Sequence, residues 1–446
     1  MAQKGEAPPS ELAPGNPYSA QQRPPTSRRA QAAWCLYDWA NQGYPTIIET
    51  FIFATFFTQV VAINEVEGTA QWGYALSIAG LFIILLSPIF GAVADQGGRR
   101  KPWLAGFSGL CMAACAMLWF TQPSNDYVLW ALVFFALGSA TYEFSLIFYN
   151  AMLPDVAPPG RLGRLSGWGW SAGYAGGLAS LVLILVLFVQ PEQPLFGLDR
   201  ETSEHVRVSA LVVAGWWFLF GLPLFFFVPD RKATGVPLGQ AVRRGLRQLL
   251  QTARNLPRYR NVARFLLARM LYNDGLNTVF AFGAIYAAGT FGMGFDQIVL
   301  FGIGLNITAG LGAFAFAWII DMIGSKRSIQ ISLVGMLLIG IVLVLLQSVF
   351  WFWVFGLMLG IFFGPVQAAS RALMAQLAPQ GLEGEMFGLY ALSGKAIAFL
   401  GPAVLAFTTG LFESQRAGMA SIMLFLILGF ALLWGVREPS HRGESA

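Results

Sequence analysis

The chain has 446 residues, of which 56% are hydrophobic and only 11% are charged, and its formal net charge is +5. Soluble domains carry about 25% charged residues, so this composition excludes an ordinary water-soluble protein and predicts an integral membrane protein. With two His, three Cys and no Cys/His cluster, the chain lacks the residues of a metal site or a hydrolase. We therefore expect no catalytic residue, no metal and no cofactor.

The apolar segments follow a polar start. Residues 1–30 are rich in Pro, Gln and Ser, which predicts a disordered cytoplasmic tail without a signal peptide. Apolar runs of about 20 residues or more, the length that spans a bilayer, then recur to the end of the chain. We predict an all-α membrane protein with twelve transmembrane helices, at 32–62, 72–94, 102–121, 126–153, 161–190, 207–228, 260–289, 297–322, 326–347, 350–378, 384–411 and 416–436.

Lys and Arg residues decide the orientation of these helices. Of the 28, 22 fall in the tails and in loops on one side, and three fall in loops on the other side. Cytoplasmic loops carry the excess of positive charge, so both termini are expected in the cytoplasm. The excess of basic residues then reflects the orientation in the membrane, and we expect no nucleic-acid partner. Short loops and tails favour a bacterial inner membrane.

The loop after the sixth span, residues 229–259, contains a predicted amphipathic helix. Its apolar residues recur at helical spacing and its arginines lie off that stripe; the stripe consists of Val242, Leu246, Leu249, Ala253 and Leu256. This pattern favours a helix on the cytoplasmic leaflet that links two six-helix bundles, 31–228 and 260–437, with a C-terminal tail at 438–446. A solvated linker helix is the alternative.

An internal repeat supports two related halves. Asp95 and Asp321 are each followed by Gly three residues later and then by basic residues, at an offset of 226 residues. Asp38 and Asn41 recur as Asp274 and Asn277, at an offset of 236 residues. Duplicated transporters bind their substrate near the midplane between the halves.

Several predicted spans carry ionisable or amide side chains. A charge at the centre of a membrane helix costs about 2.5–3.5 kcal/mol, so such side chains usually face a wet cavity and have a partner. The candidate substrate-binding or coupling residues are Asp38, Asn41, Glu49, Glu143, Asn150, Asp274, Asn277, Gln367, Arg371 and Lys395. The alternative is that these side chains form structural ion pairs that lock helices together. For Arg269 and Arg371, a structural or gating role and a role in the site both stay open.

We expect these residues to have different roles in solute binding and in proton coupling. We expect Lys395 to hold a carboxylate of the substrate, and Asp38, Asn41 and Asp274 to hold its amine or other donors. Glu49 or Glu143, near mid-depth, would take up a proton and couple it to transport.

The loop "GAVADQGGRRKP", residues 91–102, resembles the signature loop of the major facilitator superfamily, with Gln96 where that pattern usually has Arg. The resemblance implies that Asp95, together with Arg99 and Arg100, closes the cytoplasmic gate between the halves. Asp321 is expected at the equivalent place in the second half. A helix-end charge in water is the alternative for Asp95.

Motifs along the membrane region resemble one family of that superfamily. "YDWANQ" at 37–42, "FYNAMLPD" at 148–155, "LYNDGLNT" at 271–278 and "FGLYALSGKAIAFLGP" at 387–402 are similar to the vacuole-effluxer family. Fungal members release amino acids from the vacuole. The resemblance places Asp38, Asn41, Asn150, Arg371 and Lys395 at motif positions. Glu49 departs from the family pattern, which leaves a cationic substrate or another coupling ion open.

We therefore predict a monomeric secondary transporter for a small polar solute, an amino acid or a related compound, that works by alternating access with protons as the coupling partner. No G-x-x-x-x-G-K-[ST] loop is present, so a gradient rather than ATP would drive it. The alternatives are a membrane scaffold or assembly factor on a transporter fold, a transporter of a lipid-like or cationic substrate, and a lipid-modifying membrane enzyme.

Overall fold

The computed structural model describes residues 27–254 and 256–439, and within these residues it contains helices and no strand. The predicted tail segments 1–26 and 440–446 lie outside the described residues. The predicted helical membrane fold with twelve spans is confirmed. The boundaries proposed for the two bundles and the linker stay a prediction.

The first six spans begin with an irregular one, formed by α1 (Arg28–Asn41), a π-helix η1 (Tyr44–Phe51), α2 (Phe53–Phe56) and a second π-helix η2 (Phe57–Val61). The next five are α3 (Glu65–Gly97), α4 (Lys101–Leu118), α5 (Val128–Ala151) followed by the short α6 (Leu153–Val156), α7 (Leu162–Ile184) extended by η4 (Leu185–Val189), and α8 (Glu204–Phe227). Short 3-10 turns are η3 (Asn125–Tyr127) and η5 (Leu195–Gly197).

The second six spans follow the linker helix α9 (Leu238–Arg254) and the turn η6 (Leu256–Tyr259). They are α10 (Arg260–Phe291), α11 (Phe295–Ile323), α12 (Ser325–Leu345), α13 (Val349–Leu377), the broken pair α14 (Glu383–Lys395) and α15 (Leu400–Phe412), and α16 (Gln415–Trp434). Eleven spans are long and apolar enough to cross a membrane on hydropathy alone. The twelfth, α10, carries buried polar side chains such as Arg269, Asn273 and Asp274.

Several boundaries differ from the prediction, among them the start of the second span at Glu65 instead of residue 72, and two further differences have identifiable reasons. Helix α1 begins at Arg28 instead of residue 32, because the Ser27 side chain accepts a hydrogen bond from the Ala30 N–H and caps the first turn. The eleventh span was expected to be continuous over 384–411, but it breaks between Lys395 and Leu400. Pro402 lies in the first turn of α15; in a continuous helix its ring would clash with the Ala398 carbonyl, so the helix restarts.

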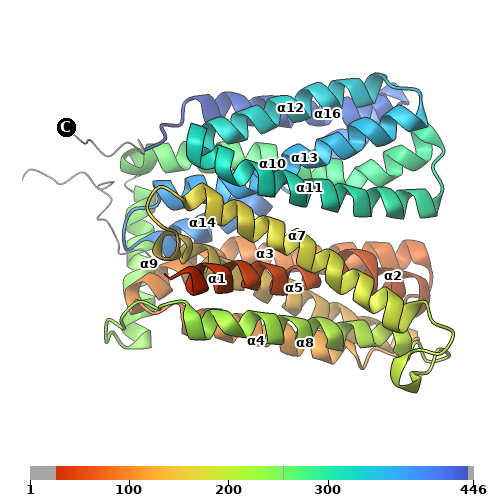
Figure 1. The fold of residues 1–446 in the computed structure, drawn as a ribbon, viewed down its shortest axis with the longest axis horizontal. Coiled ribbons are helices and arrows are strands. Elements are labelled where there is room, and N and C mark those ends of the chain that lie inside the picture. The colour runs from red at the N-terminus through yellow and green to blue at the C-terminus, as the bar shows by residue number, and fades with distance from the viewer. Residues whose placement is uncertain (1–26, 255, 440–446) are drawn as a thin grey trace, which may run out of the picture.

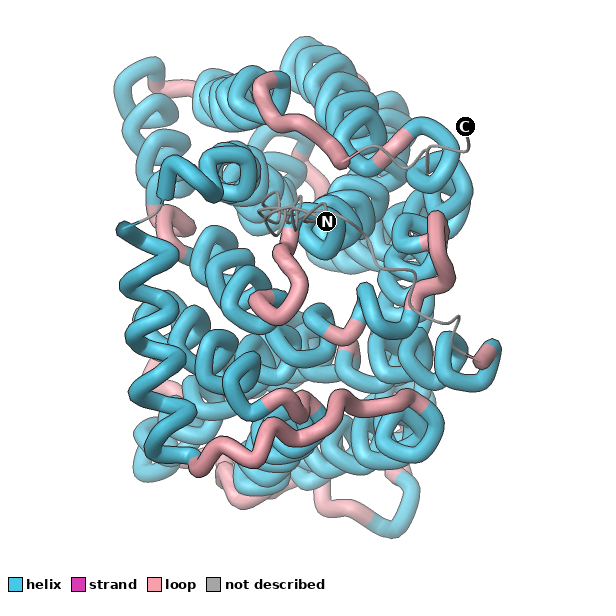
Figure 2. Tube along the Cα trace, turned by 90° about the vertical axis from the view of Figure 1, so that its left-hand side faces the viewer, coloured by secondary structure: helices cyan, strands magenta, loops and turns pink. Residues whose placement is uncertain are grey.

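The two halves lie one above the other in Figure 1. Helix α7 of the first half and α14 of the second lie at their boundary. Across the boundary, α7 packs against α11 and α13, and α3 packs against α14. We call the end that carries α9 and the α3–α4 loop the inner end, following the predicted orientation. Figure 2 looks onto this end, where α9 runs along one edge.

The predicted amphipathic helix is present as α9, but its packed face differs from the predicted apolar stripe. Ala241, Gly245 and Thr252 are buried, and Gly245 approaches the backbone of Ala92 and Val93 in α3. Val242 and Leu246 of the predicted stripe are exposed. The small residues therefore face the protein, and Val242 and Leu246 are left exposed. Contact of α9 with a lipid leaflet stays a prediction.

Candidate functional site

A cavity of about 1260 Å³ lies between the two halves. Its walls come mainly from the first, fourth and fifth spans of one half and from α10, α11, α12, α13, α14 and α16 of the other. It extends to Gln59, Val189 and His205 at the outer end of the bundle and stops at polar residues near mid-depth. Because α3 packs on α14 at the inner end, the structure is open to the outside and closed to the inside.

The wall of the cavity is largely apolar and aromatic toward the outer end, for example at Phe51, Phe56 and Phe301. Its polar lining concentrates at the floor. The floor residues are Glu49, Glu143, Asn150, Arg269, Asn273, Asn277, Gln367, Arg371 and Lys395. A solute that reaches the floor thus exchanges water for a few fixed charges in an otherwise apolar pocket.

Three ionisable side chains from both halves meet at this floor. The Lys395 ammonium lies 3.1 Å from a Glu143 carboxylate oxygen, and both side chains are partly exposed to the cavity. Glu49 accepts a hydrogen bond from the Ser139 hydroxyl at 2.7 Å. The Tyr44 hydroxyl lies 3.2 Å from the same hydroxyl of Ser139. The π-helix η1 therefore presents Glu49 beside α5, opposite the Lys395 end of α14.

Asp274 and Asn277 were both named as candidate site residues, but the structure separates them. Asn277 lines the cavity, whereas Asp274 is 2% exposed and does not line it. The Asp274 carboxylate instead accepts a hydrogen bond from the Gly401 N–H at 2.8 Å. Gln367 also lines the cavity and donates a hydrogen bond to the Asn273 side chain at 3.2 Å.

Arg371 and Asp38 form an ion pair between the halves on the inner side of the floor. The distance is 2.8 Å, and the guanidinium also donates to the Ser166 hydroxyl and the Ser166 carbonyl at 2.9 and 2.7 Å. It lies over the Trp34 ring, 4.8 Å from the centroid. Asn41 and Asn150 border the same small space beside the pair. This arrangement satisfies a buried arginine fully and fits the alternative of a structural or gating role.

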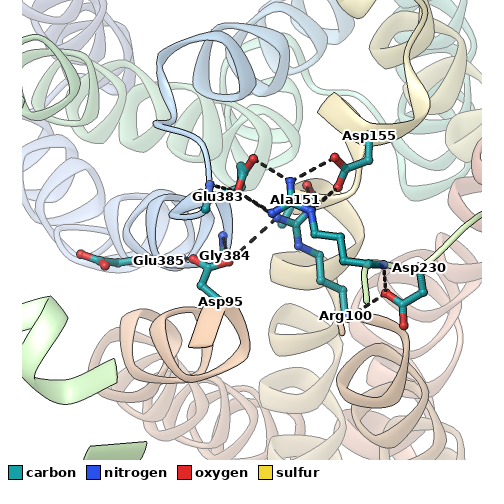
Figure 3. A network of polar contacts seen from close by, with 10 residues as sticks. Asp95, Arg100, Ala151, Asp155, Asp230, Glu383, Gly384 and Glu385 are labelled. Carbon is teal, nitrogen blue, oxygen red and sulfur yellow. Dashed lines mark hydrogen bonds and ion pairs between the residues drawn. The ribbon is translucent and has the colours of Figure 1, made fainter. Parts of the chain in front are cut away.

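At the inner end, Asp95 closes the contact between α3 and α14 (Figure 3). Its two carboxylate oxygens accept the N–H groups of Gly384 and Glu385 at 2.9 and 2.8 Å. These are free donors in the first turn of α14, where a helix favours a negative charge. Asp95 thus joins the first half to the second through the backbone.

A second layer of charges surrounds this contact (Figure 3). The Arg100 guanidinium lies 2.7 Å from Asp155 and 3.0 Å from Glu383, and it also donates to the Ala151 carbonyl. Arg231, from the linker that precedes α9, lies 2.9 Å from Asp155 and 2.7 Å from Glu383. Two arginines therefore bridge one carboxylate from each half. Asp155, Arg231 and Glu383 were not among the predicted gate residues.

The other predicted gate residues lie apart from this cluster. The Arg99 side chain is largely exposed and pairs with Asp230 at 3.4 Å, within the first half and the linker. Asp321 accepts the Arg164 N–H at 3.0 Å and pairs with the Arg164 side chain at 3.4 Å. This contact joins α11 to α7, so Asp321 forms a second connection between the halves at the inner end.

Gly91 and Gly384 permit the close approach of α3 and α14. A methyl group at Gly91 would collide with the Gly384 carbonyl, so Gly91→Ala is expected to destabilise the protein by about 1–3 kcal/mol, the usual cost of overpacking. Intrinsic tryptophan fluorescence during heating would then report a lower melting temperature.

Gly80→Ala, in the same helix, is the matched control. An added methyl there meets nothing within 4 Å, and alanine suits a helix better than glycine, so its melting temperature should stay equal or rise. Equal melting temperatures for the two variants would show that the Gly91 contact does not stabilise the protein.

Comparison with known proteins gives consistent results. The family described as "Vacuole effluxer Atg22 like" matches residues 59–446. The chain is 26% identical over 426 residues to the uncharacterized MFS-type transporter YxiO of Bacillus subtilis, which covers 94% of this chain and 97% of that protein. It is also 26% identical over 311 residues to autophagy-related protein 22 of Cryptococcus neoformans, covering 63% of this chain and 54% of that one.

Among solved structures, the chain is similar to the Escherichia coli major facilitator superfamily transporter FucP in the outward conformation. The TM-score is 0.70 at 15% sequence identity, with 95% of this chain and 100% of that chain covered. At this identity the likeness concerns the fold alone.

Proposed function

Because this chain belongs to the Atg22-like vacuole effluxer family of major facilitator transporters, and is therefore a multi-pass membrane transporter and not an enzyme, we propose that it carries a small zwitterionic solute, an amino acid or a related compound. The observation that carries the proposal is the charge arrangement at the cavity floor. One ammonium from the second half faces two carboxylates from the first half, with water access from the outside.

The signs of these charges are complementary to the carboxylate and the ammonium group of an amino acid. Lys395 would bind the carboxylate of the solute, and Glu143 and Glu49 would bind its ammonium group. Charge-assisted hydrogen bonds of this kind contribute about 1.5–3 kcal/mol each. The solute would separate Lys395 from Glu143 and take their place as the electrostatic link between the halves.

Alternating access would then proceed by rocking of the halves around the bound solute. In the outward-open state Asp95, Arg100, Arg231 and Glu383 close the inner end. Opening that end must break these contacts, and the new contacts that bound solute makes across the floor would offset part of the cost. A proton gradient would drive the cycle through a buried carboxylate.

The charge distribution and the position of the cavity support two further proposals, on localisation and on assembly. The positive-inside distribution favours a bacterial inner membrane with both termini in the cytoplasm. The cavity lies within a single chain, so a monomer would suffice for transport. A scaffold has no need of a cavity that reaches mid-depth, and this favours a transporter over that alternative.

A cationic solute is the second candidate, and Glu49 favours it. In the described part of the chain Glu49 has a hydroxyl donor and no ion pair, whereas Glu143 is paired with Lys395, so Glu49 is the floor carboxylate left to bind a cation. A diamine or a basic amino acid would supply that cation.

Counterflow in proteoliposomes tests the proposal. Vesicles preloaded with a mixed amino-acid pool should accumulate labelled amino acids from outside, whereas vesicles without protein should not. A parallel arm with labelled arginine and putrescine distinguishes the cationic candidate. Folded, reconstituted protein that exchanges no member of either pool would refute the assignment.

A further inference from the structure

Helix α10 holds both ends of the break in the eleventh span. On the α14 side, Arg269 donates to the Tyr390 carbonyl and the Ser393 hydroxyl, each at 2.8 Å, and Asn273 donates to the Gly394 carbonyl at 3.4 Å. On the α15 side, Asp274 accepts the Gly401 N–H at 2.8 Å. The segment between these attachments begins at Lys395, the cation of the cavity floor.

The charges on α10 complement the two helix ends. A helix favours a cation at its C-terminus and an anion at its N-terminus, and α10 offers Arg269 to the end of α14 and Asp274 to the start of α15. A side chain at Gly401 would lie 3.2 Å from the Asp274 carboxylate and would collide with the Thr278 hydroxyl. Glycine at this position therefore allows the carboxylate to reach the helix end.

One oxygen of Asp274 has no partner. Its Oδ1 is buried and makes no hydrogen bond, although the whole residue is only 2% exposed. The Thr278 hydroxyl donates to the Asp274 main-chain carbonyl instead of to the carboxylate. The negative charge is thus stabilised on one oxygen alone.

The charged groups on the neighbouring elements either pair elsewhere or lie at an end of the bundle, as Glu383 and Glu385 do in the first turn of α14. Lys395 of α14 pairs with Glu143, Arg371 of α13 pairs with Asp38, and Asp321 of α11 pairs with Arg164. Arg416, the ionisable residue of α16, donates to the Val344 carbonyl near the outer end, and α15 contains no ionisable residue. Arg269, on α10 itself, binds α14. Over the ranges the structure describes, no ion pair neutralises Asp274.

We propose that Asp274 is the proton-binding residue of the transport cycle, a proposal that rests on the transport function above and specifies its coupling. A proton would bind Oδ1, and its later release to the opposite side would restore the carboxylate. A single oxygen without a partner suits a proton, whereas hard metal cations gather about six oxygen ligands.

The consequence for the site follows from the helix break. Protonation removes the charge that holds the first turn of α15, and the hydrogen bond from Gly401 then has a neutral acceptor. Charge-assisted hydrogen bonds are about twice as strong as neutral ones, so the attachment weakens. The segment 396–399 then gains freedom to move, and Lys395 moves with it. Proton binding and solute binding are thereby coupled through one segment.

The Asp274→Asn variant tests the proposal, because its side chain keeps the shape and stays neutral. In proteoliposomes with labelled amino acids, accumulation driven by a pH gradient, expressed relative to counterflow by the same variant, should fall at least ten-fold. Glu438→Gln is the control: Glu438 also caps a helix, α12, but binds the Ser325 and Lys326 N–H groups through both oxygens. It should keep gradient-driven accumulation, and an Asp274→Asn variant that keeps it too would overturn the inference.

A second measurement keeps this test independent of the proposed solute. Infrared difference spectra across a pH titration should show carbonyl bands of protonated carboxylic acids, and subtracting the Asp274→Asn spectra from those of wild type should isolate the band of one buried acid. If no amino acid or cation is exchanged, the function above fails while the infrared result still decides the proton site. If Asp274→Asn does not fold, Asp274→Glu should shift the midpoint of the same titration; an unchanged midpoint would refute the proposal.

Discussion

Replacing Lys395 with Gln should lower amino-acid counterflow by about 10- to 100-fold, with folded protein still recovered from the membrane. The variant loses the charge-assisted hydrogen bond to the solute carboxylate, worth about 1.5–3 kcal/mol, and leaves Glu143 and Glu49 uncompensated at the floor. Initial rates in proteoliposomes, normalised to reconstituted protein, measure the effect. Lys395→Arg keeps the charge and should retain part of the activity.

A double variant separates a substrate role from a structural ion pair. If Lys395 and Glu143 only lock the halves together, replacing both with Gln should restore activity, because the cost of breaking such a pair comes from the charge left behind. If Lys395 binds solute, the double variant stays as inactive as Lys395→Gln. Lys326→Gln is the matched control, since Lys326 binds the Trp434 carbonyl far from the cavity. Wild-type rates in the Lys395→Gln variant would contradict the assignment.

Replacing Glu383 with Gln should open the inner end. Glu383 accepts hydrogen bonds from Arg100 and Arg231 and so joins the second half to both arginines. In the neutral variant each of these strong hydrogen bonds would lose about 1.5–3 kcal/mol of its contribution to the stability of the closed state. A Ser87→Cys reporter measures the opening, because Ser87 is fully buried and its backbone lies against Gly388 of α14. In a background without the three native cysteines, maleimide labelling of the reporter should rise about 10- to 100-fold.

The control for this prediction lies at the same end of the protein. Glu438→Gln removes a carboxylate that caps α12 within the second half and, across residues 27–254 and 256–439, forms no hydrogen bond or ion pair with the first half. It should leave labelling of the Ser87→Cys reporter unchanged. Equal labelling rates in the Glu383→Gln variant and the parent would show that the charge cluster does not hold the gate closed.

Most of the twelve spans were predictable because lipid requires about 20 apolar residues per helix, a constraint that eleven of the spans in the described part of the chain meet alone. The ends and breaks of helices depend on single residues. Ser27 starts α1 four residues early, and Pro402 interrupts the eleventh span. The proline was visible in the sequence, but prolines are common inside membrane helices, and only the neighbouring α10 shows how the break is stabilised.

The partners of the charged residues at the inner end could not be predicted from the sequence. Asp95 could be placed at the inner end from its loop, but its partners are backbone N–H groups in α14, almost 300 residues away. Arg231 sits in a linker that looks solvent-exposed in the sequence, and its two carboxylate partners come from separate helices. Charges at helix ends are frequent, and pairing among them depends on tertiary contacts that spacing does not encode.

Asp274 shows the same limit within a helix. Asp274 and Asn277 were both candidate site residues, yet a difference of three residues turns a side chain by about 60° on a helix, enough to place one residue in the cavity and the other against α15. The sequence made Asp274 a candidate, but its contact with α15 could not be predicted from spacing.

Alternating access around the cavity floor is tested most directly by two reporters on opposite sides of it. Thr55→Cys lies in the cavity wall toward the outside, and Ser87→Cys lies in the closed inner interface. Adding an amino acid that the protein exchanges should slow labelling of the first reporter and speed labelling of the second. If both rates stay constant, or both rise together, the cavity does not open alternately to the two sides.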